Sequence, residues 1–319
     1  MTSKRKAAKK GTKRTSKKAA KKSPKKAAKK AVTRTAAKSG KRPQRRTARA
    51  ALAVATSPRK SAAQRVAAMA EAPLAVCEAD ENLQKMLDVL RNADEPIKVR
   101  LAALQSLQAA SFSVIAFEAC RGDYIAALRQ VATDPDPELR QRVLGLLARE
   151  KDGFAQRKLL EGLRKPEKAL VPPEKALQLL SYDIHADAYA AAREIVGEPP
   201  NPAAKQEALR LLAADATAAP MFEKVLLDKG ELRENRQIAA AALQALRPEK
   251  LQERAREILL DAGEYPEIQA TSLTALTQFG DESALEQDQP LIERVGRLKG
   301  EGGTKVKQSA RQFLNRYVR

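Results

Sequence analysis

From about residue 80 onward, apolar residues recur at the spacing of amphipathic helices, and short turns rich in Pro, Gly and Asp separate these helices. One helix pattern repeats: an apolar or small residue, three further residues, then Ala-Leu-x-x-Leu or a close variant. Its copies begin at Val99, Leu139, Pro172, Ala204, Ile238 and Ile268, and a degraded copy begins at Val306, where Arg311 takes the place of a leucine. The fourth residue after each start is the anchor position of the repeat, and successive anchors lie 30 to 40 residues apart.

A period of this length with two helices per unit is typical of an α-solenoid, in which helical hairpins stack on their neighbours. The first helix of a hairpin is visible in residues 83–90, 124–131, 221–227 and 251–260. Small residues at the anchor allow neighbouring helices to approach closely, and the flanking leucines can then interdigitate. We therefore predict an all-α fold, with about seven helical hairpins over residues 80–319.

The best single copy, residues 134–147, reads Asp-Pro-Asp-Pro-Glu-Leu-Arg-Gln-Arg-Val-Leu-Gly-Leu-Leu. Its Asp-Pro turn and the following Arg140 resemble the units of HEAT/armadillo-type repeat proteins, and Asp94 with Arg100 repeats the arrangement. The resemblance covers roughly residues 80–319. It implies a HEAT-like α-α superhelix that presents a curved surface to protein partners, and it implies little else about function.

The basic residues at the equivalent place of the repeat are candidates for a ligand groove. They are Arg100, Arg140, Lys205 and Lys307, whereas Pro173, Ala239 and Gln269 occupy that place in the other units. These cations could line a groove for phosphate or an acidic peptide, or each could pair with a turn carboxylate such as Asp94 or Asp136. Residues 71–319 carry a net charge of −4, which favours the pairing interpretation over a continuous basic groove.

The N-terminal part has a different composition. Residues 1–70 hold 25 Lys and Arg and no Asp or Glu, and no aromatic residue precedes Phe112. So little apolar surface and so much like charge predict a disordered segment over residues 1–66, followed by a linker or leading helix at 67–79. The expected ligand of such a segment is a polyanion, bound through phosphate contacts that weaken as salt rises.

Two tetrads sharpen this expectation, Ser23-Pro24-Lys25-Lys26 and Ser57-Pro58-Arg59-Lys60, because a Ser-Pro turn that projects two cations suits a narrow minor groove. With its paired lysines, the segment resembles the tails of linker histones and of bacterial histone-like proteins. The resemblance implies DNA compaction or tethering, with phosphorylation of Ser23 or Ser57 weakening the contact. The candidate nucleic-acid-binding residues are Lys17, Lys18, Lys21, Lys22, Ser23, Pro24, Lys25, Lys26, Lys29, Lys30, Arg45, Arg46, Ser57, Pro58, Arg59 and Lys60.

Several kinds of chemistry find little support in the sequence. Cys77 and Cys120 do not have a zinc-site spacing, and a single histidine, His185, excludes a His-paired metal site. The segment Gly300-Glu301-Gly302-Gly303-Thr304 is not a phosphate loop, because neither a strand before it nor a Gly-Lys ending is present. We expect the aromatic residues to pack on apolar helix faces: Phe112, Phe117, Tyr182, Tyr189, Phe279 and Phe313. No enzyme activity, cofactor, metal, membrane span or secretory signal is predicted.

The sequence thus predicts a non-enzymatic, DNA-associated adaptor inside the cell, at the nucleoid or chromatin. Its tail would bind nucleic acid, chiefly duplex DNA, without sequence preference, and its solenoid would bind an unidentified protein. The alternative is a protein-interaction scaffold whose tail serves localisation or contacts RNA or the ribosome. A helical-repeat DNA glycosylase or lyase is a third hypothesis, although the chain has no Trp to hold a damaged base.

Overall fold

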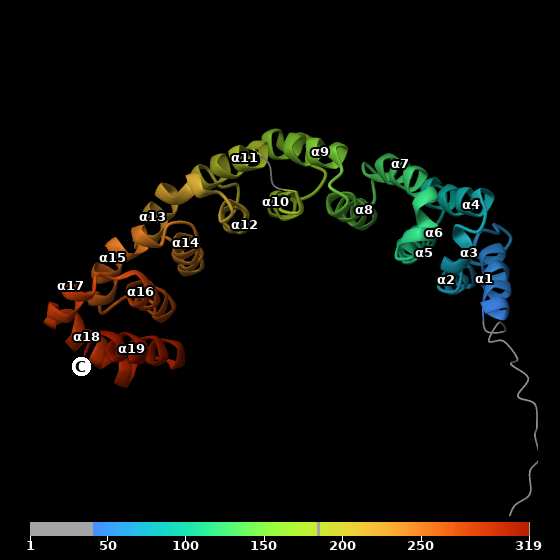
Figure 1. Cartoon of the computed structure of the whole chain (residues 1–319). Coiled ribbons are helices and arrows are strands. Elements are labelled where there is room, and N and C mark those ends of the chain that lie inside the picture. Colours follow the sequence, from blue (N-terminus) through green and yellow to red (C-terminus); the bar gives the residue numbers. More distant parts are fainter. Residues whose placement is uncertain (1–40, 184–185, 319) are drawn as a thin grey trace, which may run out of the picture. The chain divides into compact units, whose positions relative to one another are not determined.

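The computed structural model describes residues 41–183 and 186–318, and the side chains of 41–46 and Leu74 are excluded from the description. In these residues every regular element is a helix, and no strand is present (Figure 1). The chain from Pro43 onward forms one compact unit. The predicted all-α fold is confirmed.

Seven helical hairpins follow one another from Asp80 to Tyr317, in agreement with the predicted number. Their first and second helices are α4 (Asp80–Arg91) with α5 (Ile97–Ser111), α7 (Arg121–Val131) with α8 (Pro137–Arg149), α9 (Gly153–Arg164) with α10 (Pro173–Leu180), α11 (Ala186–Gly197) with α12 (Pro202–Leu212), α13 (Ala219–Leu227) with α14 (Arg233–Leu246), α15 (Pro248–Leu260) with α16 (Pro266–Phe279), and α18 (Gln289–Glu301) with α19 (Thr304–Tyr317). Shorter helical segments lie between successive hairpins: α6 (Val114–Phe117), α17 (Glu282–Gln287) and the 3-10 turns Glu118–Cys120 and Ala216–Ala218. The short helix α3 (Pro73–Val76) precedes the first hairpin, and the 3-10 turn Pro166–Lys168 lies within the α9–α10 hairpin.

The hairpins stack so that their helices form two layers (Figure 1). In the second-helix layer, each of α5, α8, α10, α12, α14, α16 and α19 contacts the next one along the chain. In the first-helix layer, α4 contacts α7, α9 contacts α11, and α15 contacts α18. Sequence neighbours are therefore spatial neighbours throughout, as expected of a repeat protein.

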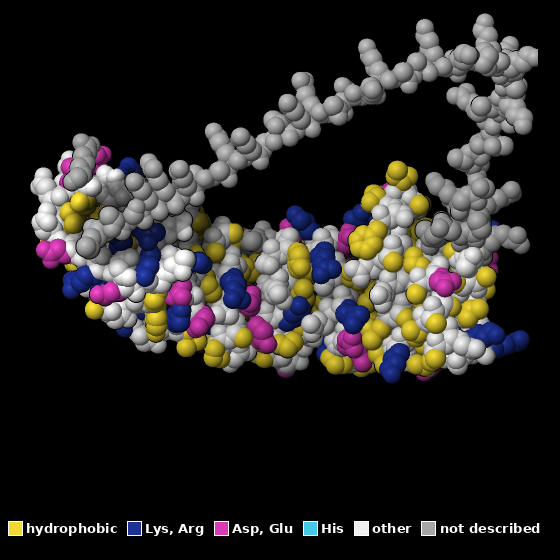
Figure 2. All heavy atoms as spheres, turned by 90° about the horizontal axis from the view of Figure 1, so that it is seen from below, with side chains coloured by type: hydrophobic (Ala, Val, Ile, Leu, Met, Phe, Trp, Pro, Cys, Tyr) yellow, Lys and Arg dark blue, Asp and Glu magenta, His cyan; other side chains and the backbone are white. Residues whose placement is uncertain are grey.

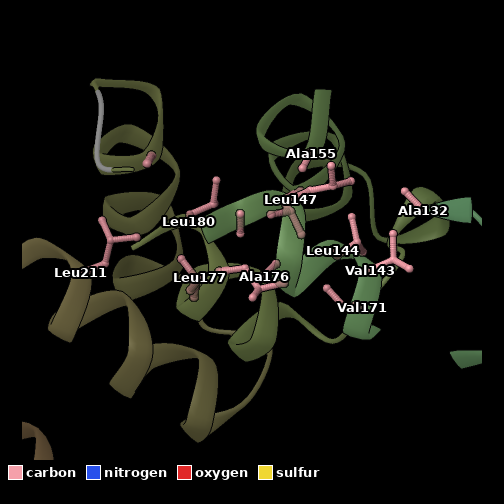
Figure 3. Packing of buried hydrophobic residues seen from close by; sticks show 14 of the residues in the cluster. Ala132, Val143, Leu144, Leu147, Ala155, Val171, Ala176, Leu177, Leu180 and Leu211 are labelled. Atoms are coloured by element: carbon pink, nitrogen blue, oxygen red, sulfur yellow. The ribbon is translucent and has the colours of Figure 1, made fainter. Parts of the chain in front are cut away.

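Alanine and leucine fill the interior between the layers. Leu144 and Leu147 of α8 lie in the same apolar interior as Ala176 and Leu177 of α10 (Figure 3). The side chains of Leu144, Leu147 and Leu177 are completely shielded from solvent. A buried leucine contributes about 1.5–3 kcal/mol relative to an exposed one, so the buried leucines of this seam stabilise the packing of neighbouring hairpins.

Local signals in the sequence set the ends of the helices. Asp136 caps α8 by accepting a hydrogen bond from the backbone N–H of Leu139 at 2.8 Å, and Asn201 caps α12 through Ala204 at the same distance. At the other end of α8, Lys151 adopts a left-handed conformation with φ of 54°. The Lys151 and Asp152 N–H groups donate to the carbonyls of Ala148 and Leu147, which is the hydrogen-bond pattern of a Schellman motif.

The structure corrects the predicted extent of the N-terminal segment. Residues 41–66, expected to belong to a disordered tail, contribute the helices α1 (Lys41–Ala55) and α2 (Ala62–Met69), and α2 packs on α5. The prediction failed because the apolar stripe of α1 is made mainly of alanine, a weak hydrophobic signal in a strongly basic context. The stripe has helical spacing and is buried; its members are Ala48, Ala51, Leu52 and Ala55.

The expected linker or leading helix of residues 67–79 contains the end of α2 and the short helix α3. Within the described residues, no single helix combines the length and apolar character that a membrane crossing requires. The helical segments 97–111 and 114–131, taken together, are long and apolar enough by length and composition alone, but they are bent by 116° relative to each other.

Candidate interaction surfaces

The repeat-position cations were the first candidates for a groove, and Arg100 shows what the fold does with them. Its side chain is 5% exposed. Nε of Arg100 donates to the carbonyl of Leu90 at 3.0 Å, near the end of the preceding first helix, and a terminal nitrogen pairs with Asp134. Asp134 lies in the turn of the next hairpin, so Arg100 connects three elements of the stack instead of facing a groove.

The same geometry occurs at two residues that the sequence analysis did not single out. Nε of Arg65 donates to Ala55 and Nε of Arg236 donates to Leu226, in each case to a carbonyl ten residues earlier, at 3.0 and 2.8 Å. The guanidinium of Arg65 also binds both oxygens of Glu95, which precedes α5. These contacts satisfy a carbonyl at the end of one helix and fix the turn before another.

Arg236 binds Glu264 across the next hairpin at 2.6 Å, and their side chains are 3% and 0% exposed. Burial alone would raise the pKa of Glu264, but hydrogen bonds from Arg236, Lys229 and the Tyr265 N–H hold that pKa below its usual value. The pair is therefore charged and enclosed.

Of the remaining repeat-position cations, Arg140 and Lys205 also reach the next hairpin. Arg140 donates to the carbonyl of Leu170 and, at 2.7 Å, to that of Asp134, while Lys205 pairs with Glu231 in the turn before α14. Lys307 lies on α19, the last helix described, and its side chain has no hydrogen-bond or ion-pair partner in the described part of the chain. We refer to the contacts of Arg65, Arg100, Lys205 and Arg236 with carboxylates of the following hairpin as the inter-hairpin links.

Arg236 also corrects the phase that we assigned to the fifth unit. The sequence pattern placed the anchor at Ala242, which put Ala239 at the place of the cation. Since Arg236 makes the contacts that Arg100 makes, the anchor of this unit is Ala239, and the pattern was three residues out of phase. The sequence carries only a weak signal for this phase, which is an arginine three residues before a small residue together with an acidic residue in the turn of the next hairpin, here Glu264.

The predicted nucleic-acid-binding residues are only partly described. Lys17, Lys18, Lys21, Lys22, the tetrad from Ser23 to Lys26, Lys29 and Lys30 lie outside the described residues, and Arg45 and Arg46 fall on α1 without described side chains. The second tetrad forms the turn between α1 and α2, in which the Lys60 N–H donates to the Ser57 carbonyl at 3.2 Å. Ser57 is half-buried, whereas Pro58, Arg59 and Lys60 are exposed.

The expected core packing of the aromatic residues holds for some of them and is wrong for others. Phe117 and Phe313 are buried and Tyr189 is half-buried. Phe112, Tyr182 and Phe279, in contrast, are 78%, 46% and 49% exposed. Each of these three lies at or just beyond the C-terminal end of a second helix, where the apolar stripe no longer faces a neighbouring helix.

The two cysteines, 43 residues apart in sequence, come together in the fold. Burial, together with a hydrogen bond with Cys120, raises the pKa of the Cys77 thiol to about 12. A thiol of this kind is protonated and unreactive at neutral pH. His185 lies outside the described residues, and Gly302 and Gly303 separate α18 from α19. No group of His, Cys, Asp and Glu that could hold a metal ion occurs among the described residues.

Two hollows lie on the central hairpins. The larger, about 800 Å³, is mainly apolar and is formed by the ends of α8 to α12 and the loop before α10. Arg140 lines it, although its guanidinium is engaged by backbone carbonyls. The smaller, about 480 Å³, lies on the side of α5, α8 and α10 that faces away from the first-helix layer (Figure 1), and we call it the α5–α10 groove. Its polar lining residues are Gln105, Gln108, Gln141, Arg142, Arg149, Lys175, Gln178 and Tyr182.

The α5–α10 groove is basic. Among the described residues, none that lines it is Asp or Glu. The Arg142 side chain pairs with Glu138 one turn away, but the Arg149 side chain has no hydrogen bond or ion pair within the described chain, and Nζ of Lys175 donates only to the Gln178 amide. The Arg149 guanidinium lies over the Tyr182 ring, 5.8 Å from its centroid.

An apolar projection stands next to this groove. Phe112, Val114 and Ile115, between α5 and the end of α6, are 78%, 67% and 96% exposed, and we call them the apolar tip. Phe112 follows the groove residue Gln108 by four positions on the same helix, a rise of about 6 Å. Figure 2 shows an apolar projection on the half of the stack that contains α5, beside scattered Lys and Arg side chains of the second-helix layer.

No model of a known family and no curated protein sequence matches this chain. Among solved structures, it is similar to the complex of CpcE and CpcF of phycocyanin lyase from Nostoc sp. PCC7120, with 17% identity and a TM-score of 0.37 over 89% of this chain and 100% of that chain. It is also similar to human deoxyhypusine hydroxylase in complex with glycerol, with 15% identity and a TM-score of 0.33 over 77% of this chain and 99% of that one. At these values neither likeness extends to activity.

Proposed function

We propose that the protein is a DNA-bound adaptor without enzymatic activity, in which the basic N-terminal segment binds phosphates and the stacked hairpins bind a protein partner. The observation that carries the proposal is the separation of charge along the chain. Residues 1–70 have 25 basic and no acidic residues, whereas residues 71–319 have a net charge of −4. A cationic segment of this density releases counterions from DNA whatever the base sequence.

The geometry of the second tetrad supports the same proposal. The hydrogen bond between Ser57 and Lys60 closes a turn that leaves Arg59 and Lys60 exposed at one end of the stack. Two adjacent exposed cations on a tight turn can contact phosphates of the DNA backbone. Within the stack, by contrast, the side chains of Arg65, Arg100, Lys205 and Arg236 are held by carboxylates in the inter-hairpin links. These cations are unavailable to DNA, so we assign the DNA contact to the N-terminal segment.

Fluorescence anisotropy with labelled duplex DNA over a salt series tests whether the N-terminal segment, and not the hairpin stack, binds DNA. The matched variant lacks residues 1–40, which contain 17 Lys and Arg, and keeps the compact unit from Pro43 onward intact. We expect the deletion to weaken DNA binding by roughly a hundredfold or more at moderate salt and to flatten the dependence of affinity on salt.

A second variant, Arg59→Gln with Lys60→Gln, should lower the salt slope by roughly one to two ion equivalents. Equal affinity and equal slope for the intact and shortened chains would refute the assignment of DNA binding to the segment. A parallel titration with duplex RNA discriminates the alternative scaffold, because preferential RNA binding would favour contact with RNA or the ribosome.

A further inference from the structure

We propose that the α5–α10 groove and the apolar tip together form the docking site for an acidic segment of the partner protein, one that carries an apolar anchor residue. This inference names the class of partner for the hairpin stack, and so it rests on the proposed function. It concerns a surface that is distinct from the inter-hairpin links and from the N-terminal segment.

Charge is the first argument. The groove presents Arg142, Arg149 and Lys175 with no lining carboxylate among the described residues, on a body that is acidic as a whole. Elsewhere in the stack, exposed cations are commonly held by a carboxylate, as in the pairs Arg121–Glu150, Arg233–Glu267 and Arg256–Asp288. Arg149 and Lys175 lack such a partner in the described chain and are open to an external one.

The neutral residues of the groove supply the second argument. Glutamine amides project from three successive second helices, at Gln105 on α5, Gln141 on α8 and Gln178 on α10. Each amide can both donate and accept a hydrogen bond, which suits the backbone of an extended peptide that crosses the helices. Tyr182 adds a flat surface, and the cation above its ring is already desolvated on one side.

The apolar tip supplies the third argument. Three large apolar side chains that are at least two-thirds exposed on one short segment are unusual for a surface without a binding role. The tip lies about one helical turn beyond the groove residue Gln108, so one bound segment can reach both. Acidic residues in the groove and an apolar residue at the tip give the usual composition of a protein interface, an apolar patch with a polar rim.

The tip also distinguishes a peptide from a nucleic acid. Nucleic-acid interfaces are polar and strongly basic, and exposed Val114 and Ile115 would gain nothing from phosphates. The groove is short, with three cations, whereas the N-terminal segment offers many more. These features favour a peptide over a nucleic acid. Because the three cations could still bind phosphates, single-stranded nucleic acid is the alternative occupant that the experiment tests.

The probe is a short synthetic peptide of Glu residues with one Leu, labelled with fluorescein and a benzophenone, and it is used with the full-length chain. Anisotropy reports affinity, and mass spectrometry of the photocrosslinked product reports where the peptide lies. The crosslink position separates groove binding from attraction to the basic N-terminal segment. Matched peptides replace Glu by Gln, or Leu by Ser, and single-stranded DNA serves as a competitor.

Three double variants complete the design. The groove variant, Arg149→Gln with Lys175→Gln, removes the two charges that have no carboxylate partner. The tip variant, Phe112→Ser with Ile115→Ser, removes two apolar side chains of the apolar tip. The control variant, Arg297→Gln with Lys299→Gln, removes the same number of charges from exposed positions on α18. We expect crosslinks on α5, α8 or α10 that the groove variant reduces by about tenfold and the control variant leaves unchanged. The tip variant should bind the Leu and Ser peptides equally.

Crosslinks confined to the N-terminal segment, or an equal loss in the α18 control, would overturn the docking site. Preferential crosslinking of single-stranded DNA to the groove would overturn the peptide assignment. Duplex DNA affinity, measured on the same variants, is expected to be unchanged. A failure of DNA binding to depend on residues 1–40 would count against the proposed function, whatever the peptide shows.

Discussion

Replacing Glu264 by glutamine removes one charge from an enclosed ion pair while nearly preserving the shape of the side chain. The Arg236 and Glu264 side chains are 3% and 0% exposed, and the guanidinium donates to the carboxylate at 2.6 Å. Nε of Arg236 also donates to the carbonyl of Leu226. Arg236 is thus fixed by its surroundings, and its charge cannot turn toward solvent when the carboxylate is neutralised.

The magnitude follows from this confinement. Removing one partner of a buried pair costs about 3–5 kcal/mol, because the other charge stays desolvated. Arg236 and Lys229 donate to Oε2 of Glu264 and the Tyr265 N–H donates to Oε1, so the single oxygen of glutamine can accept at only one of these two positions. We therefore expect the full loss in the free energy of unfolding, about 3–5 kcal/mol. The matched control is Glu253→Gln, whose partner Lys250 is 46% exposed, and it should cost about 0–0.5 kcal/mol.

Urea unfolding followed by circular dichroism measures both variants, and hydrogen exchange locates the effect. Since Glu264 links α14 to the turn before α16, exchange should accelerate chiefly in the hairpins from α15 to α19. Combining Arg236→Met with Glu264→Gln should lose less stability than the sum of the single variants, by about 1–3 kcal/mol, because no uncompensated charge remains. Equal midpoints for E264Q and E253Q, or additive losses in the double variant, would refute the buried-pair reasoning.

Two further predictions concern pH and the end of α8. Because the folded pKa of Glu264 is depressed, its contribution is complete above the unfolded value of about 4.3 and is lost as pH falls through the folded pKa. The stability difference between wild type and E264Q should therefore shrink as urea midpoints are measured from about pH 7 toward about pH 3, and a constant difference would contradict the assignment. Lys151→Gly should raise the free energy of unfolding by about 0.5–1 kcal/mol, since glycine adopts the left-handed conformation without a Cβ penalty; a lower urea midpoint would show that the Lys151 side chain matters more than the backbone.

The sequence predicted the hairpins well where leucine marks the apolar stripe. Copies such as Leu139–Leu147 contain large apolar residues at helical spacing, so both the helix and the position of the repeat anchor within it could be predicted. In the fifth unit, Ala239 to Ala242 are four alanines in a row, and a small-residue stripe fits equally well three residues earlier or later. Only the contacts of Arg236 with Leu226 and Glu264 fix the phase, and these depend on residues 10 and 28 positions away.

The candidate surfaces were harder to predict for a related reason. A cation at a repeated position looks like a lining residue in sequence, because its partner belongs to the next hairpin. Arg100 and Asp134 are 34 residues apart, and no local pattern joins them. The residues that form the α5–α10 groove, such as Arg149 and Tyr182, occupy the variable outer face of the second helices, where the repeat imposes no pattern.

The direction in which a cation points from its helix explains both the inter-hairpin links and the α5–α10 groove. A cation that points along the stack meets a carboxylate of the following turn, as Arg65 meets Glu95 and Lys205 meets Glu231. Such a cation serves stability and is unavailable to a ligand. A cation that points outward from the second-helix layer has no neighbouring hairpin to satisfy it, as at Arg149. In this chain, therefore, charge alone does not mark a binding surface: the α5–α10 groove is proposed as one because its unlinked cations have no lining carboxylate among the described residues and lie beside the apolar tip.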